Sequence, residues 1–277
     1  MSVTDYKAYQ KIITDSYDER SASYAKSEWH RALAERLVDY FPPRAGDTVL
    51  DIATGTGNVA FHAAKQVGED GRVIGVDISK GMIAEAERIR LASQSANIEF
   101  TLADGEQLDY PDNSFDRIYC ASAFFWVADK PRALANWYRL LKPGGILGFH
   151  ATPETSFVYG YVARNVLKTY GVEYLAHSPT GSKEICESLM KKAGYTEIQV
   201  NDVKEGHFIT LQEARDAWIT EEHYPVGQYP HPVAVTQQAI LDKAQRDYDA
   251  EMARRLTDKG IWNDTTMYYV YGTKGLR

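Results

Sequence analysis

Two acidic residues flank a glycine-rich turn in the first third of the chain. The turn reads Asp51-Ile52-Ala53-Thr54-Gly55-Thr56-Gly57, and Asp77 ends a second apolar stretch twenty residues after Gly57. Glycines in such a turn let the backbone approach a ligand closely, and a carboxylate at the end of the next strand can hold ribose hydroxyls. The spacing therefore predicts a strand–turn–helix–strand unit that binds a nucleotide-type ligand.

The kind of nucleotide depends on Asp51. Gly55, Gly57 and Ala60 also fit the glycine fingerprint of dinucleotide-binding proteins. A carboxylate at Asp51 would repel a pyrophosphate, whereas it suits a ligand that carries an ammonium group. The tight turn Lys142-Pro143-Gly144-Gly145, and an insertion before the last strand, also favour the ammonium-bearing ligand over NAD.

The elements that must position these residues follow from the hydrophobic pattern. Strands are expected at 48–52, 72–77, 98–102, 115–121, 146–151, 197–203 and 267–273. Helices are expected at 28–40, after the glycine turn, and at 80–93, 130–141 and 181–194, the last with Ile185 facing inward. Strict alternation of strand and helix up to residue 151 indicates an α/β fold with a doubly wound, mostly parallel seven-stranded sheet. Ligands bind such sheets beyond the carboxyl ends of the strands.

The pattern also suggests three regions. Residues 1–44 should form an N-terminal helical lid, with one or two short helices before residue 28. Residues 45–207 and 264–277 should form the α/β domain. Residues 208–263 should form a mostly helical cap inserted before the last strand, including an amphipathic helix whose apolar stripe runs from Ile240 to Leu256.

Composition excludes several classes of protein. The chain has 277 residues with a net charge of −7, which argues against general nucleic-acid binding. Cys120 and Cys186 are too few for a disulfide framework and are expected to be reduced core thiols. No apolar run reaches the ~18 residues of a membrane span, and the N-terminus lacks a signal peptide. A cytoplasmic location is therefore expected.

Taken together, the motifs resemble the class I S-adenosylmethionine-dependent methyltransferases, and most closely the small-molecule branch with the quinone-biosynthesis and trans-aconitate enzymes. The resemblance covers about residues 45–150 and rests on the turn at 51–57, Gly-Val-Asp-Ile-Ser at 75–79, Ala-Asp-Gly-Glu at 103–106, Phe-Asp-Arg-Ile at 115–118 and Leu-Lys-Pro-Gly-Gly at 141–145. It implies a Rossmann-like methyltransferase fold, an enzyme that uses S-adenosylmethionine and releases S-adenosylhomocysteine, and a segment 17–24 that closes over the cofactor.

The resemblance also implies roles for individual residues. Asp51 would lie near the amino group of the cofactor, Asp77 would accept from both ribose hydroxyls, and Asp104 would accept from the adenine amino group. The other residues implied at the cofactor are Tyr24 as the lid residue, Ala53, Thr54, Gly55 and Gly57 in the turn, Ile78 and Met82 around the adenine, Gly105 and Glu106, and Ala121 and Ser122 near the methionyl part. The alternatives are that Asp77 only caps the next helix and that Met82 is ordinary core.

Methyl transfer needs alignment and exclusion of water, so a catalytic base is required only if the acceptor must lose a proton. His150, at the end of the fifth strand, is the candidate base; His207, His223 and His231 are weaker candidates, and the histidines show no metal-ligand spacing. Aromatic residues suggest a wall for an apolar or planar acceptor. The candidates for this wall are Phe124, Phe125, Trp126, Tyr159, Trp218, His223 and Tyr229.

Two other functions remain open at this point. The chain could be an NAD-dependent oxidoreductase on a similar sheet, or a cofactor-binding protein that has lost catalysis and serves as a partner subunit. The expected reaction is methyl transfer to oxygen, nitrogen or carbon of a small metabolite by a monomer or homodimer. The sequence does not identify the acceptor.

Overall fold

A computed structural model describes residues 2–176, 178–219 and 228–276. The chain divides into two compact units. The larger unit comprises residues 11–151, 186–201 and 269–277, and the smaller one comprises residues 1–10, 152–185 and 202–268. The division into three regions at 1–44, 45–207 with 264–277, and 208–263 stays a prediction.

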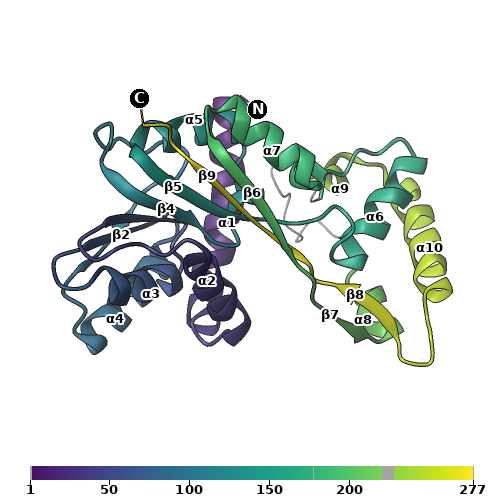
Figure 1. Ribbon diagram of the computed structural model, residues 1–277. Helices are drawn as coiled ribbons and strands as arrows, with labels where there is room; N and C mark the ends of the chain where they lie inside the picture. The colour runs from purple at the N-terminus through teal and green to yellow at the C-terminus, as the bar shows by residue number, and fades with distance from the viewer. Residues whose placement is uncertain (1, 177, 220–227, 277) are drawn as a thin grey trace. The chain divides into compact units, whose positions relative to one another are not determined.

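A seven-stranded sheet carries the larger unit, in the order β3-β2-β1-β4-β5-β9-β6 (Figure 1). Strands β3, β2, β1, β4 and β5 pair in parallel. The strands are β1 Thr48–Ile52, β2 Arg72–Asp77, β3 Ile98–Leu102, β4 Phe115–Cys120, β5 Leu141–Ala151, β6 Thr196–Val203 and β9 Met267–Thr273. The predicted α/β sheet is confirmed.

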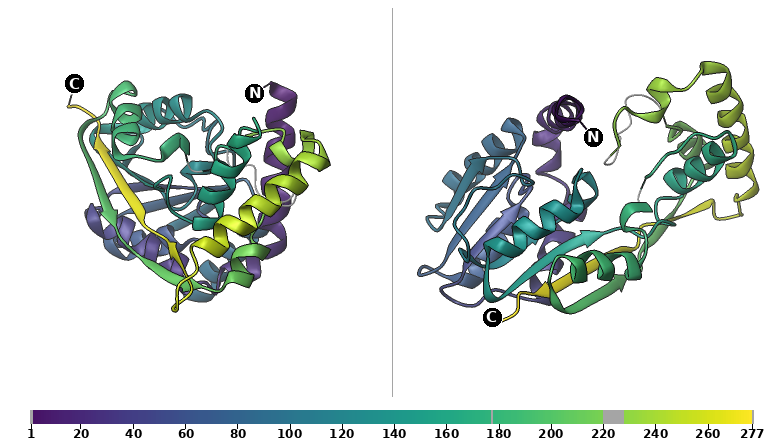
Figure 2. Two further views of the ribbon diagram at one scale, coloured as in Figure 1. Left: turned by 90° about the vertical axis from the view of Figure 1, so that its right-hand side faces the viewer. Right: turned by 90° about the horizontal axis from the view of Figure 1, so that it is seen from above.

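Helices cover both faces of these strands: α2, α3 and α4 lie on one side and α5 on the other (Figures 1 and 2). Local chemistry sets their ends, because the side chains of Ser27, Ser79 and Asp129 each accept a hydrogen bond from the first turn of α2, α4 and α5. The helices are α1 Val3–Tyr24, α2 Glu28–Tyr40, α3 Asn58–Val67, α4 Lys80–Ser93 and α5 Lys130–Leu140. The apolar residues of α3 that are buried are Val59, Ala60, Ala63, Ala64 and Val67.

The smaller unit packs α6, α8 and α10 around an apolar cluster that includes Trp218 and Tyr248. Figure 2 shows α10 beside α6. Its elements are α6 Val158–Thr169, the 3-10 helix η2 Ser178–Thr180, β7 Gly206–Ile209, α8 Leu211–Asp216, α9 Pro232–Val235, α10 Gln238–Arg254 and β8 Ile261–Asp264; α7 Lys183–Lys192 spans the division between units.

Several sequence predictions were wrong in detail. Residues 3–24 form one long helix and not one or two short ones. Strand β5 begins at Leu141 rather than at residue 146, because the Lys142–Gly145 turn is a bulge within the strand: the pairing register jumps from Phe115 with Leu141 to Arg117 with Ile146. Ile185 and Leu256 were expected to face inward, yet they are 40 % and 46 % exposed.

The antiparallel pair β7 and β8 was missed altogether. Each of these strands has only four residues, and they lie more than fifty residues apart in the sequence. Alternation over four residues is too short a signal for a strand. Their pairing depends on the tertiary fold, and no local sequence pattern predicts it.

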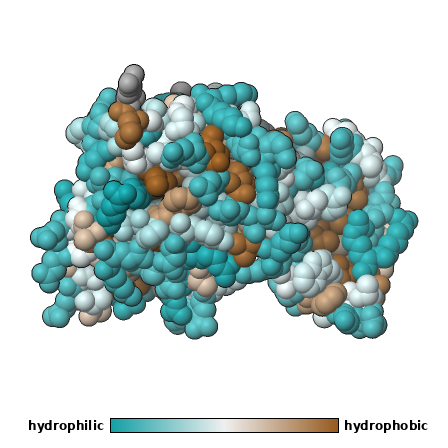
Figure 3. All heavy atoms as spheres, in the orientation of Figure 1, coloured by the Kyte–Doolittle hydropathy of each residue, from teal (hydrophilic) through white to brown (hydrophobic). Residues whose placement is uncertain are grey.

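Among the described residues, no helix is long and apolar enough to cross a membrane. The face seen in Figure 3 is largely hydrophilic.

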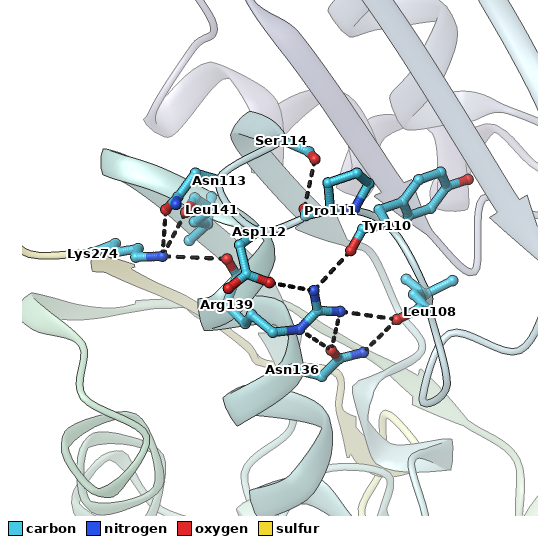
Figure 4. Close-up of polar contacts among 10 residues, drawn as sticks. All are labelled: Leu108, Tyr110, Pro111, Asp112, Asn113, Ser114, Asn136, Arg139, Leu141 and Lys274. Atoms are coloured by element: carbon cyan, nitrogen blue, oxygen red, sulfur yellow. Dashed lines mark hydrogen bonds and ion pairs between the residues drawn. The ribbon is translucent and has the colours of Figure 1, made fainter.

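Two cations hold the end of the sheet opposite the ligand side. Lys274 follows β9, and its Nζ donates to Asn113 Oδ1 (2.9 Å), to the carbonyl of Leu141 (2.8 Å) and to that of Arg139 (3.3 Å). The guanidinium of Arg139 donates to the carbonyls of Leu108 and Tyr110 in the loop between β3 and β4 (Figure 4). Lys274 thus supplies a charged donor to carbonyls at the end of α5, in addition to the backbone N–H of Asn113, which also donates to the carbonyl of Arg139 (3.1 Å).

Substitution Lys274→Met should lower the free energy of unfolding by about 1–2 kcal/mol, because it leaves carbonyls near α5 without their charged donor. Denaturant unfolding of the purified protein measures this. The control is Lys191→Met, since the side chain of Lys191 is 64 % exposed and pairs only across the helix surface. Equal stability of the two variants would contradict the prediction.

Candidate functional site

Asp51 lies near the end of β1 and is 1 % exposed. Its Oδ2 accepts hydrogen bonds from Thr54 Oγ1 (2.5 Å) and from the backbone N–H of Ala60 (3.1 Å). Its Oδ1 is buried and has no hydrogen-bond partner in the described part of the chain. Burial raises the pKa of Asp51 to about 7, against the two hydrogen bonds, which favour the charged form. A buried acceptor of this kind fits a cationic donor such as the ammonium group of S-adenosylmethionine.

Asp77 ends the neighbouring strand β2. Its Oδ2 accepts from the N–H of Gly55 (2.8 Å) and its Oδ1 from the N–H of Ser79 (2.9 Å). Each oxygen retains a second lone pair, so the carboxylate can still accept from two ribose hydroxyls. Ser79 caps α4, because its Oγ accepts a hydrogen bond from Met82 N (3.1 Å). Burial raises the pKa of Asp77, and the N–H donors oppose the shift.

The turn between these carboxylates has left-handed backbone at Ala53 (φ 54°), Gly55 (φ 55°) and Gly57 (φ 92°). A Cβ on Gly57 would lie 2.7 Å from the ring of Phe61 and 2.9 Å from that of Phe100. Thr54 ties the turn to β2, because its N–H donates to the carbonyl of Val76 (2.9 Å). Backbone strain at Ala53, where no glycine relieves it, is typical of functional turns.

The predicted adenine contacts lie on the adjacent loop and helix. Asp104 is half-buried and its Oδ1 accepts from Glu106 N (2.9 Å), while Trp137 Nε1 donates to the carbonyl of Gly105 (2.8 Å). Ile78 is half-buried at the end of β2. Met82 is 1 % exposed and belongs to the core under α4. The adenine contact of Met82 remains a proposal that has the least support among the cofactor residues.

Glu106 binds the backbone that follows the aromatic turn. Its carboxylate accepts from the N–H groups of Ala128 (2.8 Å) and Asp129 (2.9 Å), which follow the aromatic turn. Lys130 contacts the same turn. It is 7 % exposed, and its Nζ donates to the carbonyl of Val127 (2.8 Å). Burial lowers the pKa of Lys130 to about 8. The two charged groups therefore position the residues that precede α5.

We expect Glu106→Gln to leave the affinity for S-adenosylmethionine within about threefold of wild type and to lower the free energy of unfolding by about 1–2 kcal/mol, since an amide oxygen accepts only one of the two N–H bonds well. Calorimetric titration and denaturant unfolding measure the two effects. Glu28→Gln is the matched control, because the side chain of Glu28 is 88 % exposed. A loss of affinity of more than tenfold would contradict this prediction and indicate that Glu106 contacts the cofactor.

The aromatic turn η1, Phe124–Trp126, follows β4. Phe124 is fully buried, with its ring centroid 4.2 Å from that of Phe149, so it serves the core. Phe125 and Trp126 are half-buried and remain candidates for the acceptor wall. Trp126 also contacts α1, because its Nε1 donates to Tyr17 Oη (3.1 Å).

His150 on β5 is fully buried. Its Nδ1 accepts from the N–H of Ser122 (3.0 Å), a residue that the structure holds in the left-handed region at φ 51°. Burial lowers the pKa of His150 to about 3, so the ring is neutral and its proton resides on Nε2. Such a ring is poorly suited to receive a proton from an acceptor. The geometry favours a role in holding Ser122, next to Ala121, at the end of β4.

The remaining acceptor candidates belong to the smaller unit. Tyr159 is half-buried on α6, and Trp218, 7 % exposed, packs on Tyr248 at 4.9 Å between ring centroids. Tyr229 is half-buried, and His223 lies outside the described residues. Of the weaker base candidates, His207 is exposed on β7, and His231 Nδ1 accepts from Val233 N (3.3 Å) at the start of α9.

Two polar residues near the strand ends were not anticipated. Asp18 of α1 contacts Ser79 across 61 sequence positions, and Lys130 points its charge into a turn of apolar residues. The sequence signal for Lys130 is its place directly after a helix-capping aspartate; Asp18 lies within the segment 17–24 that the resemblance implies, but its contact with Ser79 has no local signal.

Comparison with known proteins identifies the family of the chain. Residues 49–145 match the model of a family described as "Methyltransferase domain". The ubiquinone/menaquinone biosynthesis C-methyltransferase of Hydrogenovibrio crunogenus is 32 % identical over 195 residues, which cover 64 % of this chain and 76 % of the relative. The aklanonic acid methyltransferase of a Streptomyces species is 35 % identical over 51 % of this chain and 66 % of its own. A solved methyltransferase from Aquifex aeolicus shares the fold, with a TM-score of 0.56 at 17 % identity over 93 % of this chain and 98 % of that one.

Proposed function

Since the chain belongs to the S-adenosylmethionine-dependent methyltransferases, we propose that it transfers the methyl group of this cofactor to an oxygen, nitrogen or carbon atom of a small, apolar or aromatic metabolite. The buried, unpartnered Oδ1 of Asp51 is the observation that carries the assignment of the site. In a dinucleotide-binding turn a carboxylate there would face a pyrophosphate, which it repels. Beside an ammonium group it gains the charge-assisted partner that it lacks.

Different residues of the larger unit would bind different parts of the cofactor. Asp51 would hold the amino group of the cofactor, and Asp77 would hold both ribose hydroxyls. Asp104 and Gly105 would meet the adenine, and the turn Ala53–Gly57 would pass beside the methionyl part. Thr54 and Gly55 each donate a bond to one of the two carboxylates, which fixes their orientation before the ligand arrives.

When bound, S-adenosylmethionine supplies an electrophilic methyl group on a sulfonium. The chain has to align the acceptor with that methyl group and keep water out. Tyr24 and Trp126 would do so at the mouth of the site, where both are half-buried. His150 would keep the backbone of Ser122 in place and would not act as a base, because the ring is sealed from the site's solvent.

The aromatic turn supports an apolar or planar acceptor. Phe125 and Trp126 present ring surface directly after β4, where the acceptor would meet the cofactor. Two relatives are named for the biosynthesis of ubiquinone and menaquinone and for aklanonic acid. We extend from them only the chemical class, a small molecule with a ring system.

The net charge of −7 supports a small-molecule acceptor over a nucleic acid. Cys120 and Cys186 are both buried thiols, as suits a reducing compartment, so we propose a cytoplasmic enzyme. A monomer or a homodimer is the proposed state.

Calorimetric titration with S-adenosylmethionine and separately with NAD tests the proposal. The expected result is a Kd on the order of 1–100 μM for S-adenosylmethionine and no heat with NAD. A screen of quinones, phenols and amines, read by mass spectrometry for the gain of one CH₂, then identifies the acceptor class. Binding of NAD alone would overturn the proposal, and tight cofactor binding without turnover on any acceptor would indicate a non-catalytic partner protein.

A further inference from the structure

Residues 11–24 of α1 contact the carboxyl ends of three strands within the larger unit. Tyr24 approaches the turn after β1, since a Cβ on Gly55 would lie 3.5 Å from Tyr24 Cε1. Tyr17 accepts the hydrogen bond of Trp126 after β4. Asp18 reaches the residues after β2. This segment therefore covers the side of the sheet where the cofactor residues gather (α1 is purple in Figure 1).

Asp18 makes the most specific of these contacts. A single oxygen, Oδ1, accepts from Ser79 Oγ (2.5 Å) and from the backbone N–H of Gly81 (2.8 Å). The N–H of Gly81 belongs to the first turn of α4, where backbone donors have no partner within the helix. Ser79 is fully buried, so its hydroxyl finds its acceptor in Asp18 rather than in water.

The backbone at the contact admits only glycine. A Cβ on Gly81 would lie 2.9 Å from the Cα of Asp18 and 2.9 Å from its carbonyl oxygen. Both atoms are backbone, so neither can turn away as a flexible side chain would. Gly81 is inside a helix, where glycine costs about 1 kcal/mol relative to alanine. Close approach of α1 is the physical reason for a glycine there.

Ser79 joins Asp18 to the ribose-binding candidate. Its N–H donates to Asp77 Oδ1 (2.9 Å) while its hydroxyl donates to Asp18. The carboxylate of Asp18 is close enough to Asp77 to add to the rise in the pKa of Asp77 that burial begins. The contact of Asp18 thus adjoins the residue that would hold the ribose.

We propose that Asp18 is a positioning residue that latches residues 11–24 over the cofactor site and thereby sets the rate at which the cofactor and its product exchange. This inference rests on the proposed cofactor site at Asp51 and Asp77. Asp18 acts through the position of the helix: while its two hydrogen bonds hold, Tyr24 stays over Gly55. Release of the product requires the latch to open.

The test measures dissociation of S-adenosylhomocysteine from the full-length protein by stopped-flow displacement with excess S-adenosylmethionine. Asp18→Ala removes the hydrogen-bond acceptor on α1. Gly81→Ala adds a methyl group on α4 that pushes α1 away. Each should speed dissociation about tenfold. The double variant should be no faster than the faster single variant, because both changes break one contact.

Two controls separate the latch from general damage. Asp18→Asn keeps an Oδ1 that can accept both bonds, and it should stay within about threefold of wild type. Asp15→Ala changes an acid one turn earlier whose side chain is 57 % exposed, and it should leave the rate unchanged.

The proposal is overturned if Asp18→Ala and Gly81→Ala lower the melting temperature yet leave the dissociation rate as in wild type, because Asp18 would then only stabilise the end of α4. It is also overturned if the two single effects multiply in the double variant. Failure of the proposed function has a different signature, since the wild-type protein would then bind neither S-adenosylmethionine nor S-adenosylhomocysteine.

Discussion

Substitution Asp77→Ala should raise the Kd for S-adenosylmethionine at least 100-fold. The carboxylate would accept two hydrogen bonds from the ribose, and bonds to charged groups are worth about 1.5–3 kcal/mol each. A loss of about 3 kcal/mol corresponds to a factor of more than 100 in Kd. Removal of Asp77 also frees the N–H groups of Gly55 and Ser79, which loosens the turn that carries the cofactor.

Calorimetric titration gives the Kd, and circular dichroism shows whether the variant remains folded. Asp70→Ala is a matched control, because Asp70 is exposed in the turn between α3 and β2. A folded Asp77→Ala variant with wild-type affinity would place the ribose elsewhere and remove the main support for this site.

Affinity for S-adenosylmethionine should fall about tenfold between pH 7 and pH 5.5 through protonation of Asp51. Its pKa is about 7 in the folded protein without ligand, because burial disfavours the charge. The cofactor's ammonium group stays mostly protonated over this range, so within the proposed ion pair Asp51 is the group whose charge changes. Binding selects the carboxylate, and each pH unit below the pKa therefore costs up to a factor of ten.

Titrations at pH 5.5, 6, 6.5 and 7 measure the slope, and Asp51→Asn should abolish it. The amide keeps an acceptor for Thr54 or Ala60 and has the same size as the acid, so the turn should persist. A wild-type affinity that is flat over this range would show that Asp51 does not meet the ammonium group.

The stability of the protein without ligand should depend on pH in the opposite direction to the affinity: it should rise as the pH falls. The pKa of Asp51 is higher in the folded protein than its ordinary value of 3.8, so the folded state takes up a proton at higher pH than the unfolded state does. The contribution of Asp51 to stability therefore grows as pH falls from about 7 toward 4. Without ligand, the melting temperature of wild type relative to Asp51→Asn should rise over this range.

The βαβ unit, the bounds of four strands and the cofactor could be predicted from the amino-acid sequence. Alternation of apolar strands with helices of matching period is a local signal, and β1, β2, β3 and β9 begin and end where it predicts. Asp51, the glycine turn and Asp77 are also local, because their spacing is set by one strand, one turn and one helix. The roles proposed for them could therefore be predicted from the order of the residues.

The surroundings of the neighbouring candidate residues depend on the tertiary fold and could not be predicted from the sequence. The sequence predicts that Glu106 contacts the cofactor; in the structure its carboxylate accepts hydrogen bonds from the N–H groups of Ala128 and Asp129. His150 looks like a base at a strand end, but burial beside Ser122 removes its basicity. Phe124 looks like a pocket wall, but it packs on Phe149.

The physical reason is the same in each case. Burial and hydrogen-bond partners come from segments distant in the sequence, and they determine whether a polar or aromatic side chain faces a ligand or the core. Asp18 is the clearest example, because its partners Ser79 and Gly81 lie on another helix more than sixty positions away. Spacing along the chain indicates the cofactor, whereas packing between distant segments sets the burial and the hydrogen-bond partners of each candidate residue.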